Sequence, residues 1–273
     1  MKKISIAIPC YNSSAFIANA LRYPVTDDRI DDIVIAEDAS NDFAETEAII
    51  KAINCPKIRL ISNSKNSGGC YINKAIAASH TKNDWVILLD ADNFFDKEYV
   101  DAIYNLPEWK QHTIYCPESG MSLPHFTWSD FTKEDIDLKM FQKYITKKNS
   151  NINFFKKTFF KLFFSLPKGL KSMISGMMLM KQSSRFLALM NDCNYFLNKQ
   201  TYLQVHTIST QKGINPFAAD TIFVNYNWLK LKNTLKVVPD MHYYHTVHAD
   251  SYWVKTVDNY EKTVAWIVTD LNK

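Results

Sequence analysis

The first part of the chain alternates short apolar runs with longer stretches of helical pattern, and this alternation limits the folds that are open to it. The apolar runs are rich in β-branched residues and lie at Ile4–Ile8, Ile33–Ala36, Ile58–Ile61 and Trp85–Leu89. Between them lie the helix-length stretches Ala15–Leu21, Glu45–Ile53 and Tyr71–Ser79. Such a pattern is typical of βαβ units. It predicts an α/β fold with a mostly parallel central sheet and helices on both faces.

Each predicted strand ends in a polar loop. The four loops are Pro-Cys-Tyr-Asn at 9–12, Glu-Asp-Ala-Ser at 37–40, Asn-Ser-Lys-Asn at 63–66 and Asp-Ala-Asp-Asn at 90–93. Open α/β sheets bind ligands beyond the carboxyl ends of their strands. We therefore expect the four loops to meet at one site.

The second half of the chain is less regular. The alternation fades after about Glu118, so we expect a boundary near residue 120, between a ligand-binding half at 1–120 and a second half at 121–273. The 273 residues suffice for one large domain, or for a core with a small appendage.

Composition narrows the class of protein. A hydrophobic fraction of 47% with 22% charged residues is ordinary for a folded soluble chain. The net charge of +4 is too mild for a nucleic-acid binder. Five cysteines without a CxxC spacing indicate neither a disulfide framework nor a zinc knuckle. The apolar run before Pro9 is too short for the hydrophobic region of a signal peptide. Together with the cysteine pattern, it predicts a cytoplasmic location.

Positive charge is concentrated between about residues 139 and 171, in a segment that is also rich in phenylalanine. The phenylalanines recur at helical spacing and lysines fall between them, at Phe155, Phe159 and Phe163 and at Lys156, Lys157 and Lys161. Such a helix can pack its aromatic stripe into the core, which is the commoner case, or lie on an anionic membrane surface as a peripheral contact.

The sharpest chemical signal is an apolar strand that ends in Asp90 and Asp92. Alternate side chains at a strand end point to the same side, so two carboxylates can converge there on one hard divalent cation. Such a cation commonly bridges carboxylates to phosphate groups. The other interpretation is an ordinary turn, because Asp and Asn are frequent turn residues.

Four segments together resemble glycosyltransferase family 2, in order and approximate spacing. They are Ile-Ser-Ile-Ala-Ile-Pro-Cys-Tyr-Asn, Ile-Val-Ile-Ala-Glu-Asp-Ala-Ser-Asn-Asp, Asn-Ser-Gly-Gly-Cys-Tyr-Ile-Asn-Lys-Ala-Ile and the Asp-x-Asp strand, within about the first 105 residues. The resemblance implies a GT-A fold, a nucleotide diphosphate sugar as donor, with a UDP-sugar favoured, and Mn²⁺ or Mg²⁺ as cofactor. The acceptor would be a glycan, lipid or protein hydroxyl. It also implies that residues 1–120 bind the donor and that 121–273 form the acceptor side.

The family pattern implies roles for matching residues. The loop at 9–12 would wall the nucleotide base, Asp38 would accept a hydrogen bond from the base, Asp90 would face the ribose and metal region, and Asp92 would ligate the metal. The positions implied to contact the donor are Pro9, Tyr11, Asn12, Asp38, Asn66, Asp90 and Ala91. The chain departs from the family pattern at Glu37, at Ala39 and in the shortened Asn66–Asn73 stretch, which lacks the usual arginine.

Two later segments supply the remaining candidates. Residues 193–205 and 215–229 resemble the family's acceptor-side strand and helices, and there Ala219 replaces a common glutamate while Asp220 keeps the second acid. An inverting transfer needs a base for the acceptor proton, and Asp220 is the candidate. Its other interpretation is a helix N-cap.

Three of the seven histidines lie close together near the C-terminal end of the chain, and His248 matches the family's metal-binding histidine best, with His245 next. Packed histidines without a metal are the alternative.

Two other functions remain open at this point. A nucleotidyltransferase uses a related architecture, but it usually has a Gly-rich phosphate loop where this chain has Pro-Cys-Tyr-Asn-Ser-Ser. A binding module that has lost catalysis is the other alternative. Asp38, Asp90, Asp92 and Asp220 together argue against it.

Overall fold

The computed structural model describes residues 2–121, 126–148, 194–216, 219–246, 248 and 252–273. Its first half has the predicted alternation. The elements are β1 (Ile4–Cys10), α1 (Ser14–Leu21), β2 (Ile30–Glu37), α2 (Phe43–Ile53), β3 (Ile58–Ser62), α3 (Cys70–Ser79), β4 (Trp85–Leu88) and α4 (Lys97–Tyr104). The strands and helices expected from the sequence are confirmed, with ends that differ by up to three residues.

The second half adds strands to the same sheet. Its described elements are β5 (Thr113–Met121), β6 (Phe126–Thr127), η1 (Ser129–Phe131), α5 (Leu138–Lys148), β7 (Phe196–Asn198), α9 (Lys199–Thr210), α10 (Asp220–Lys230), β8 (Thr234–Tyr244) and α11 (Tyr252–Leu271). The sequence suggested irregular chain after Glu118, but β5 continues to Met121 and pairs with β8.

The sheet has eight strands in the order β3-β2-β1-β4-β7-β5-β6, with β8 paired to β5. The pairs β1/β2, β2/β3, β1/β4 and β5/β8 are parallel, whereas β7 is antiparallel to both β4 and β5. The short strand β7 therefore joins the N-terminal parallel strands to the later ones. The expected α/β fold with a mostly parallel sheet is confirmed. The division near residue 120 stays a prediction, since one sheet runs through both halves.

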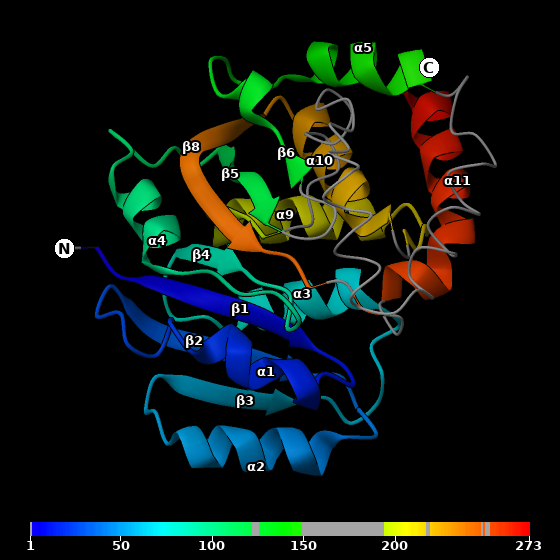
Figure 1. Cartoon of the computed structure of the whole chain (residues 1–273). Coiled ribbons are helices and arrows are strands. Elements are labelled where there is room, and N and C mark those ends of the chain that lie inside the picture. The colour runs from blue at the N-terminus through cyan, green and yellow to red at the C-terminus, as the bar shows by residue number, and fades with distance from the viewer. Residues whose placement is uncertain (1, 122–125, 149–193, 217–218, 247, 249–251) are drawn as a thin grey trace, which may run out of the picture.

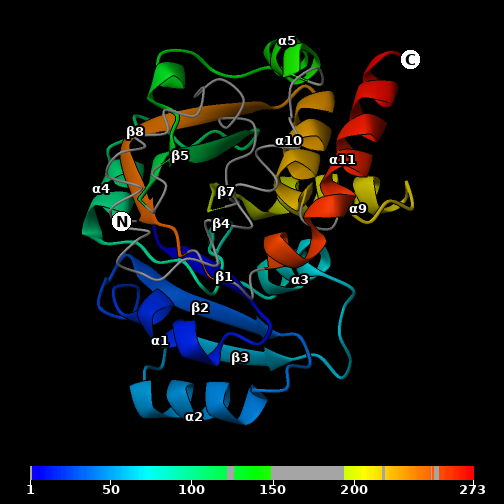
Figure 2. The same ribbon diagram turned by 45° about the vertical axis from the view of Figure 1, so that its right-hand side comes forward.

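Helices cover both faces of the sheet. Helices α1 and α2 pack together on one face, and α3, α9 and α10 lie on the other (Figures 1 and 2). Because β1 is covered on both sides, all of its residues are buried, which explains its nearly continuous apolar sequence.

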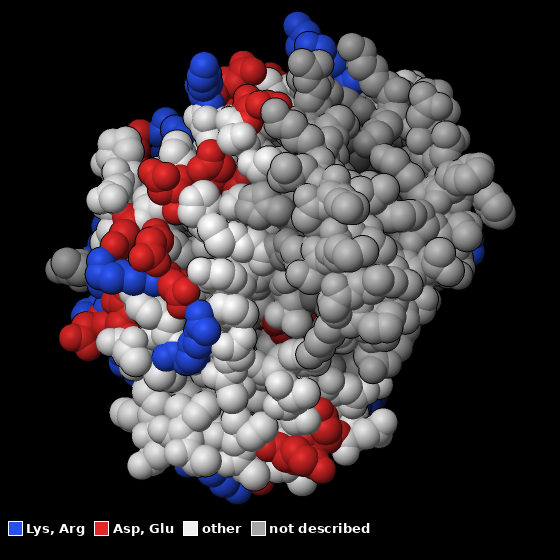
Figure 3. Space-filling model, in the orientation of Figure 1, with Lys and Arg blue, Asp and Glu red and all other residues white. Residues whose placement is uncertain are grey.

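The basic, phenylalanine-rich segment lies mainly outside the described residues. Its beginning forms α5, where Phe141 and Ile145 are buried against the core. The phenylalanine stripe at 155–163 and the lysines between are not described. Within the described residues, no helix has the length and apolar character needed to cross a membrane. On the face shown in Figure 3, acidic and basic side chains are interspersed over the described part.

A charged network fixes the chain between α1 and β2 against α4. The Arg29 guanidinium binds Asp27 at 2.6 Å and Asp101 of α4 at 2.7 Å. Tyr23 also donates a hydrogen bond to Asp27. Burial by itself raises the pKa of Asp27, but the hydrogen bonds from Arg29 and Tyr23 outweigh burial and hold this pKa at about 2. Asp27 therefore stays ionised in the folded protein at pH values that protonate it in the unfolded chain.

This network predicts a specific loss of stability in acid. The folded pKa of Asp27 is about 2 against an ordinary 3.8. Its contribution to stability, on the order of 2 kcal/mol, is therefore complete above about pH 5 and is lost as the pH falls toward 2. Urea unfolding of Asp27→Asn should show a lower stability at pH 7 and a shallower decline between pH 5 and 3. Asp28→Asn, at an exposed neighbour, is the control. Equal pH profiles for the two variants would contradict the assignment.

Candidate functional site

The loops after β1 and β2 hold each other. The Asn12 backbone N–H donates to Ser40 Oγ at 2.9 Å, and the Asn41 N–H donates to Asn12 Oδ1 at 3.0 Å. Asn12 has φ 50°, a left-handed conformation that Asn tolerates better than most residues. Pro9 is buried inside β1, whereas Tyr11 is 50% exposed. Of the loop expected to wall the base, Tyr11 is the part that offers an accessible ring.

Asp38 is buried and organises the loop after β3. Its carboxylate accepts hydrogen bonds from the Ser67 N–H at 2.7 Å, from Ser67 Oγ at 2.8 Å and from Asn63 Nδ2 at 2.8 Å. Its backbone carbonyl accepts one from Asn66 Nδ2 at 3.2 Å. A base bound by Asp38 would therefore share an oxygen that already has protein donors. Binding of the base by Asp38 and Asn66 stays a prediction.

Glu37 and Ala39, two residues at which the chain departs from the family pattern, lie in one hydrogen-bonded turn. The Glu37 carboxylate accepts hydrogen bonds from the Ala39 N–H at 3.1 Å and from the Ser40 N–H at 2.8 Å. Ala39 has φ 58°, a conformation that costs a residue with a Cβ about 1–2 kcal/mol. The glycine that is usual at position 39 would remove this cost.

The centre of the site is one ammonium group between two acids. Lys74 Nζ on α3 lies 2.9 Å from Asp90 Oδ1, after β4, and 2.9 Å from Asp220 Oδ2, at the start of α10. The side chain of Lys74 is only 4% exposed. Ala219, not Asp220, is the N-cap of α10, and the Asp220 carboxylate is directed to Lys74. The N-cap interpretation of Asp220 therefore does not hold.

The surroundings of Asp90 make it hard to ionise. Burial raises its pKa to about 6, and although Lys74 opposes the rise, the negative charges of Asp92 and Asp220 add to it. Behind the loop, the Asp90 N–H donates to Asn194 Oδ1 at 3.2 Å. Ala91 is buried beside it, with 5% of its surface exposed.

Asp92 lies against His248. His248 Nε2 is 3.1 Å from Asp92 Oδ2, and the imidazole ring lies over Phe16 with 4.6 Å between ring centroids. His248, the histidine that matches the family pattern best, thus contacts the Asp-x-Asp loop. The ring centroid of His245 lies 6.1 Å from that of Tyr243, and the His245 backbone N–H donates to the Met121 carbonyl.

Backbone pairing at the end of β8 explains how His248, late in the chain, reaches the loop after β4. Phe94 and Tyr244 exchange backbone hydrogen bonds at 3.2 and 2.7 Å and stack their rings. Two residues further on, the Thr246 N–H donates to Asn93 Oδ1 at 3.0 Å. The end of β8 is therefore fixed along the loop that contains Asp92.

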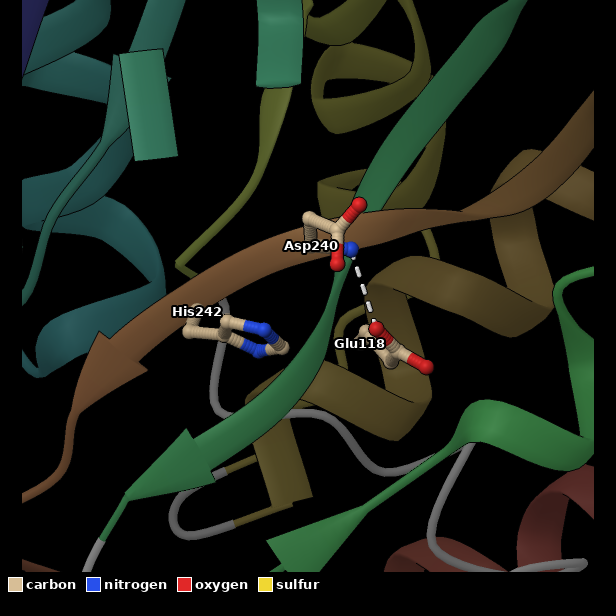
Figure 4. A group of neighbouring side chains, drawn as sticks. All are labelled: Glu118, Asp240 and His242. Carbon is tan, nitrogen blue, oxygen red and sulfur yellow. Dashed lines mark hydrogen bonds between the residues drawn. The ribbon is translucent and has the colours of Figure 1, made fainter. Parts of the chain in front are cut away.

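The pair Asp92 and His248 fits a divalent cation by its chemistry, since Mn²⁺ accepts carboxylate oxygen and imidazole nitrogen. The described residues also contain a group of three potential ligands, but it lies elsewhere, at Glu118, Asp240 and His242 (Figure 4).

Sequence reasoning missed Lys74, Asn63, Ser67 and Asn194. Lys74 had one available signal. It stands in a helix among the small apolar residues Ala75, Ala77 and Ala78, all of which are buried. A lysine in such a helix is buried only when it is paired, so a partner carboxylate could have been sought.

Comparisons with known proteins agree with this geometry. A family model described as "Glycosyl transferase family 2" matches residues 5–185, more than half of the chain. The poly(ribitol-phosphate) beta-N-acetylglucosaminyltransferase TarP of Staphylococcus aureus (strain N315) is 26% identical over 170 residues, which are 55% of this chain and 51% of TarP. The uncharacterized glycosyltransferase MG060 of Mycoplasma genitalium is 26% identical over 133 residues, 46% of this chain and 44% of that protein.

Among solved structures, TarS residues 1–349 of S. aureus in complex with UDP-GlcNAc align with a TM-score of 0.58 at 16% identity. The alignment covers 97% of this chain and 65% of that one. TarS residues 1–349 in complex with UDP align with a TM-score of 0.53. These likenesses show the fold, and the chain spans about half the length of the curated relatives it matches. The chain belongs to glycosyl transferase family 2, and it has the GT-A fold.

Proposed function

We propose that this glycosyltransferase moves a sugar from a UDP-sugar to an acceptor hydroxyl, with inversion at the anomeric carbon and with a divalent cation. One observation carries the proposal. Two groups of side chains meet at the loop after β4: Asp92 of this loop contacts His248, and Asp90 of the same loop contacts Lys74. Lys74 in turn contacts Asp220, the acid at the start of α10.

Asp92 and His248 would hold Mn²⁺ or Mg²⁺. When bound, the cation neutralises charge on the diphosphate leaving group. The imidazole favours Mn²⁺, because Mg²⁺ prefers oxygen ligands and retains several waters. Stacking on Phe16 restricts the His248 ring, so its nitrogen stays directed to the Asp-x-Asp loop.

Asp220 is the proposed base. Its Oδ2 is bound to Lys74, which leaves Oδ1 to take the proton of the attacking acceptor hydroxyl. The contact with Lys74 fixes the orientation of the Asp220 carboxylate before the acceptor arrives. The same ammonium offsets the negative charge of Asp90, next to which the diphosphate must bind.

The similar proteins indicate which substrates to test first. TarS has been crystallised with UDP-GlcNAc, and the name of TarP describes N-acetylglucosamine transfer to poly(ribitol phosphate). UDP-GlcNAc is therefore the first donor, and a hydroxyl-bearing polyol phosphate polymer the first acceptor. Of the functions that the sequence left open, nucleotidyl transfer loses its support, because the matching family transfers sugars.

We also propose the cytoplasm as the compartment. Among the described residues, Cys10 and Cys55 are free thiols, which is the state that a reducing compartment maintains.

Asp92→Asn should remove metal-dependent donor binding and leave the fold intact, because the amide has the same shape but no charge for the cation. Calorimetric titration of UDP-GlcNAc with and without Mn²⁺ measures this. Asp96→Asn, which removes a more exposed carboxylate paired with Arg22, is the matched control. Donor and Mn²⁺ affinities equal to those of the unaltered protein would remove Asp92 from the metal site.

Asp220→Asn should lower the rate of transfer by roughly 10²-fold or more and spare donor binding, because an amide cannot accept the acceptor proton. Turnover and donor affinity measured on the same preparation separate the two roles. Near-normal turnover would eliminate Asp220 as the base. Lost donor affinity in a folded variant would place Asp220 in the donor site.

Lys74→Met should lower the free energy of unfolding by about 3–5 kcal/mol, because it leaves Asp90 and Asp220 partly buried without their shared cation. The double variant Lys74→Met/Asp220→Asn should regain part of that loss. Lys82→Met breaks an exposed pair with Asp31 and should change stability little. Equal effects of the two single variants in urea unfolding would show that the bridge is not structural.

A further inference from the structure

A bulge between β5 and β8 gathers three potential metal ligands outside the site described above. Glu118 lies on β5, and Asp240 and His242 lie on β8 (Figure 4). One ligand atom from each residue lies within 4.8 Å of the others. In the strand register, Pro117 pairs with Val238 and Ser119 with His242, so residues 239–241 lie opposite Glu118 alone. The bulge is what brings residues 240 and 242 to the same glutamate.

The backbone at the bulge positions one of the carboxylates. Asp240 has φ 62°, and its backbone N–H donates to Glu118 Oε2 at 2.9 Å. This bond fixes the Glu118 carboxylate beside Asp240 and leaves Oε1 available. The Asp240 side chain is exposed, and those of Glu118 and His242 are half-buried, so the group is accessible to an ion from solvent.

Glu118 and Asp240 differ in charge balance from the other neighbouring carboxylates of the described residues. Elsewhere in the described residues, neighbouring carboxylates share a basic side chain: Lys74 lies between Asp90 and Asp220, and Arg29 lies between Asp27 and Asp101.

No lysine or arginine of the described ranges forms an ion pair with Glu118 or Asp240. Two adjacent negative charges without a cation repel each other, and a divalent ion would supply the missing countercharge.

The imidazole is oriented as a ligand. His242 Nδ1 lies 2.7 Å from Oγ of Ser119, a residue that is 4% exposed. In the tautomer whose Nδ1–H donates to this oxygen, Nε2 carries the lone pair and can bind a metal ion. A metal-binding histidine commonly uses its second nitrogen in such a hydrogen bond, which sets the tautomer and the ring orientation.

We propose that Glu118, Asp240 and His242 bind a divalent transition-metal ion, with Zn²⁺ as the best match, at a site separate from the donor site. One nitrogen and two carboxylate oxygens suit Zn²⁺, whose tetrahedral geometry at ligand distances of about 2.0–2.2 Å places ligand atoms about 3.3–3.6 Å apart. The three ligand atoms lie within 4.8 Å of one another, and side-chain rotations on binding would bring them to that spacing. Mg²⁺ fits less well because of the imidazole.

The bound ion would join β5 to β8 where their pairing is interrupted. Two residues beyond His242, Tyr244 begins the pairing with Phe94 that leads toward His248. The ion would therefore stabilise the strand that carries this segment. This role does not depend on sugar transfer, so the site can be tested in a protein whose donor site has been disabled.

The test uses Asp92→Asn as the background, so that the donor-site pair contributes no binding. Zn²⁺ is titrated calorimetrically into this protein and into the same protein with Asp240→Asn or with Asp135→Asn added. Asn retains the left-handed conformation at 240 and the backbone bond to Glu118 but removes the charge. Asp135 is an exposed carboxylate near Lys236 and serves as the matched control. All three proteins keep the same cysteines.

We expect one equivalent of Zn²⁺ to be lost, or to bind at least about tenfold more weakly, with Asp240→Asn and not with Asp135→Asn. Zn²⁺ should likewise raise the melting temperature of the background protein but not that of its Asp240→Asn form. Zinc binding that is absent from the background, or equal in the Asp240→Asn and Asp135→Asn proteins, would overturn the proposal. Sugar transfer by the single Asp240→Asn variant is measured separately. A failure of the zinc proposal is thereby distinguished from a failure of the proposed transferase function.

Discussion

The contact between the Lys74 ammonium and two carboxylates is the interaction on which the site depends. Asp90 and Asp220 come from a strand end and a helix start far apart in the sequence, and both are partly buried. Two such charges cannot be brought together without a compensating cation, because burial and mutual repulsion both oppose their ionisation. The raised pKa of Asp90, at about 6, shows that even with Lys74 present the compensation is incomplete. A divalent cation at the neighbouring Asp92 would complete it.

Sheet topology makes this contact possible. The short antiparallel strand β7 lies between β4 and β5, so Asn194, just before it, supports the Asp90 loop from behind. Strand β8 pairs with β5, and its end pairs with Phe94, which draws His248 to Asp92. The chain from β7 onward thus contacts the loop after β4 at two residues, Asp90 and Asp92. A donor-binding half by itself would have Asp90 and Asp92 but neither the proposed base nor the histidine.

Strand β8 links this site to the second group of ligands. Its bulge places Asp240 and His242 beside Glu118, and its end leads to the residues that hold His248. The carboxylates of the donor site have a lysine among them, and those at the bulge have none within the described residues. The two groups differ in charge balance, and this difference supports the proposed cation at the bulge.

The sequence by itself determined the N-terminal architecture and most of the chemistry. Local periodicity defined β1 to β4 and the helices between them, because apolar pattern and turn residues act over a few neighbouring positions. Motif order then identified the family, and it singled out Asp90, Asp92, Asp220 and His248. What the sequence could not provide was contact across long separations: the Lys74 bridge, the donors around Asp38, the insertion of β7 and the contact between His248 and Asp92. Those depend on which strands become neighbours, and the burial energy of the whole sheet decides that, rather than any local pattern.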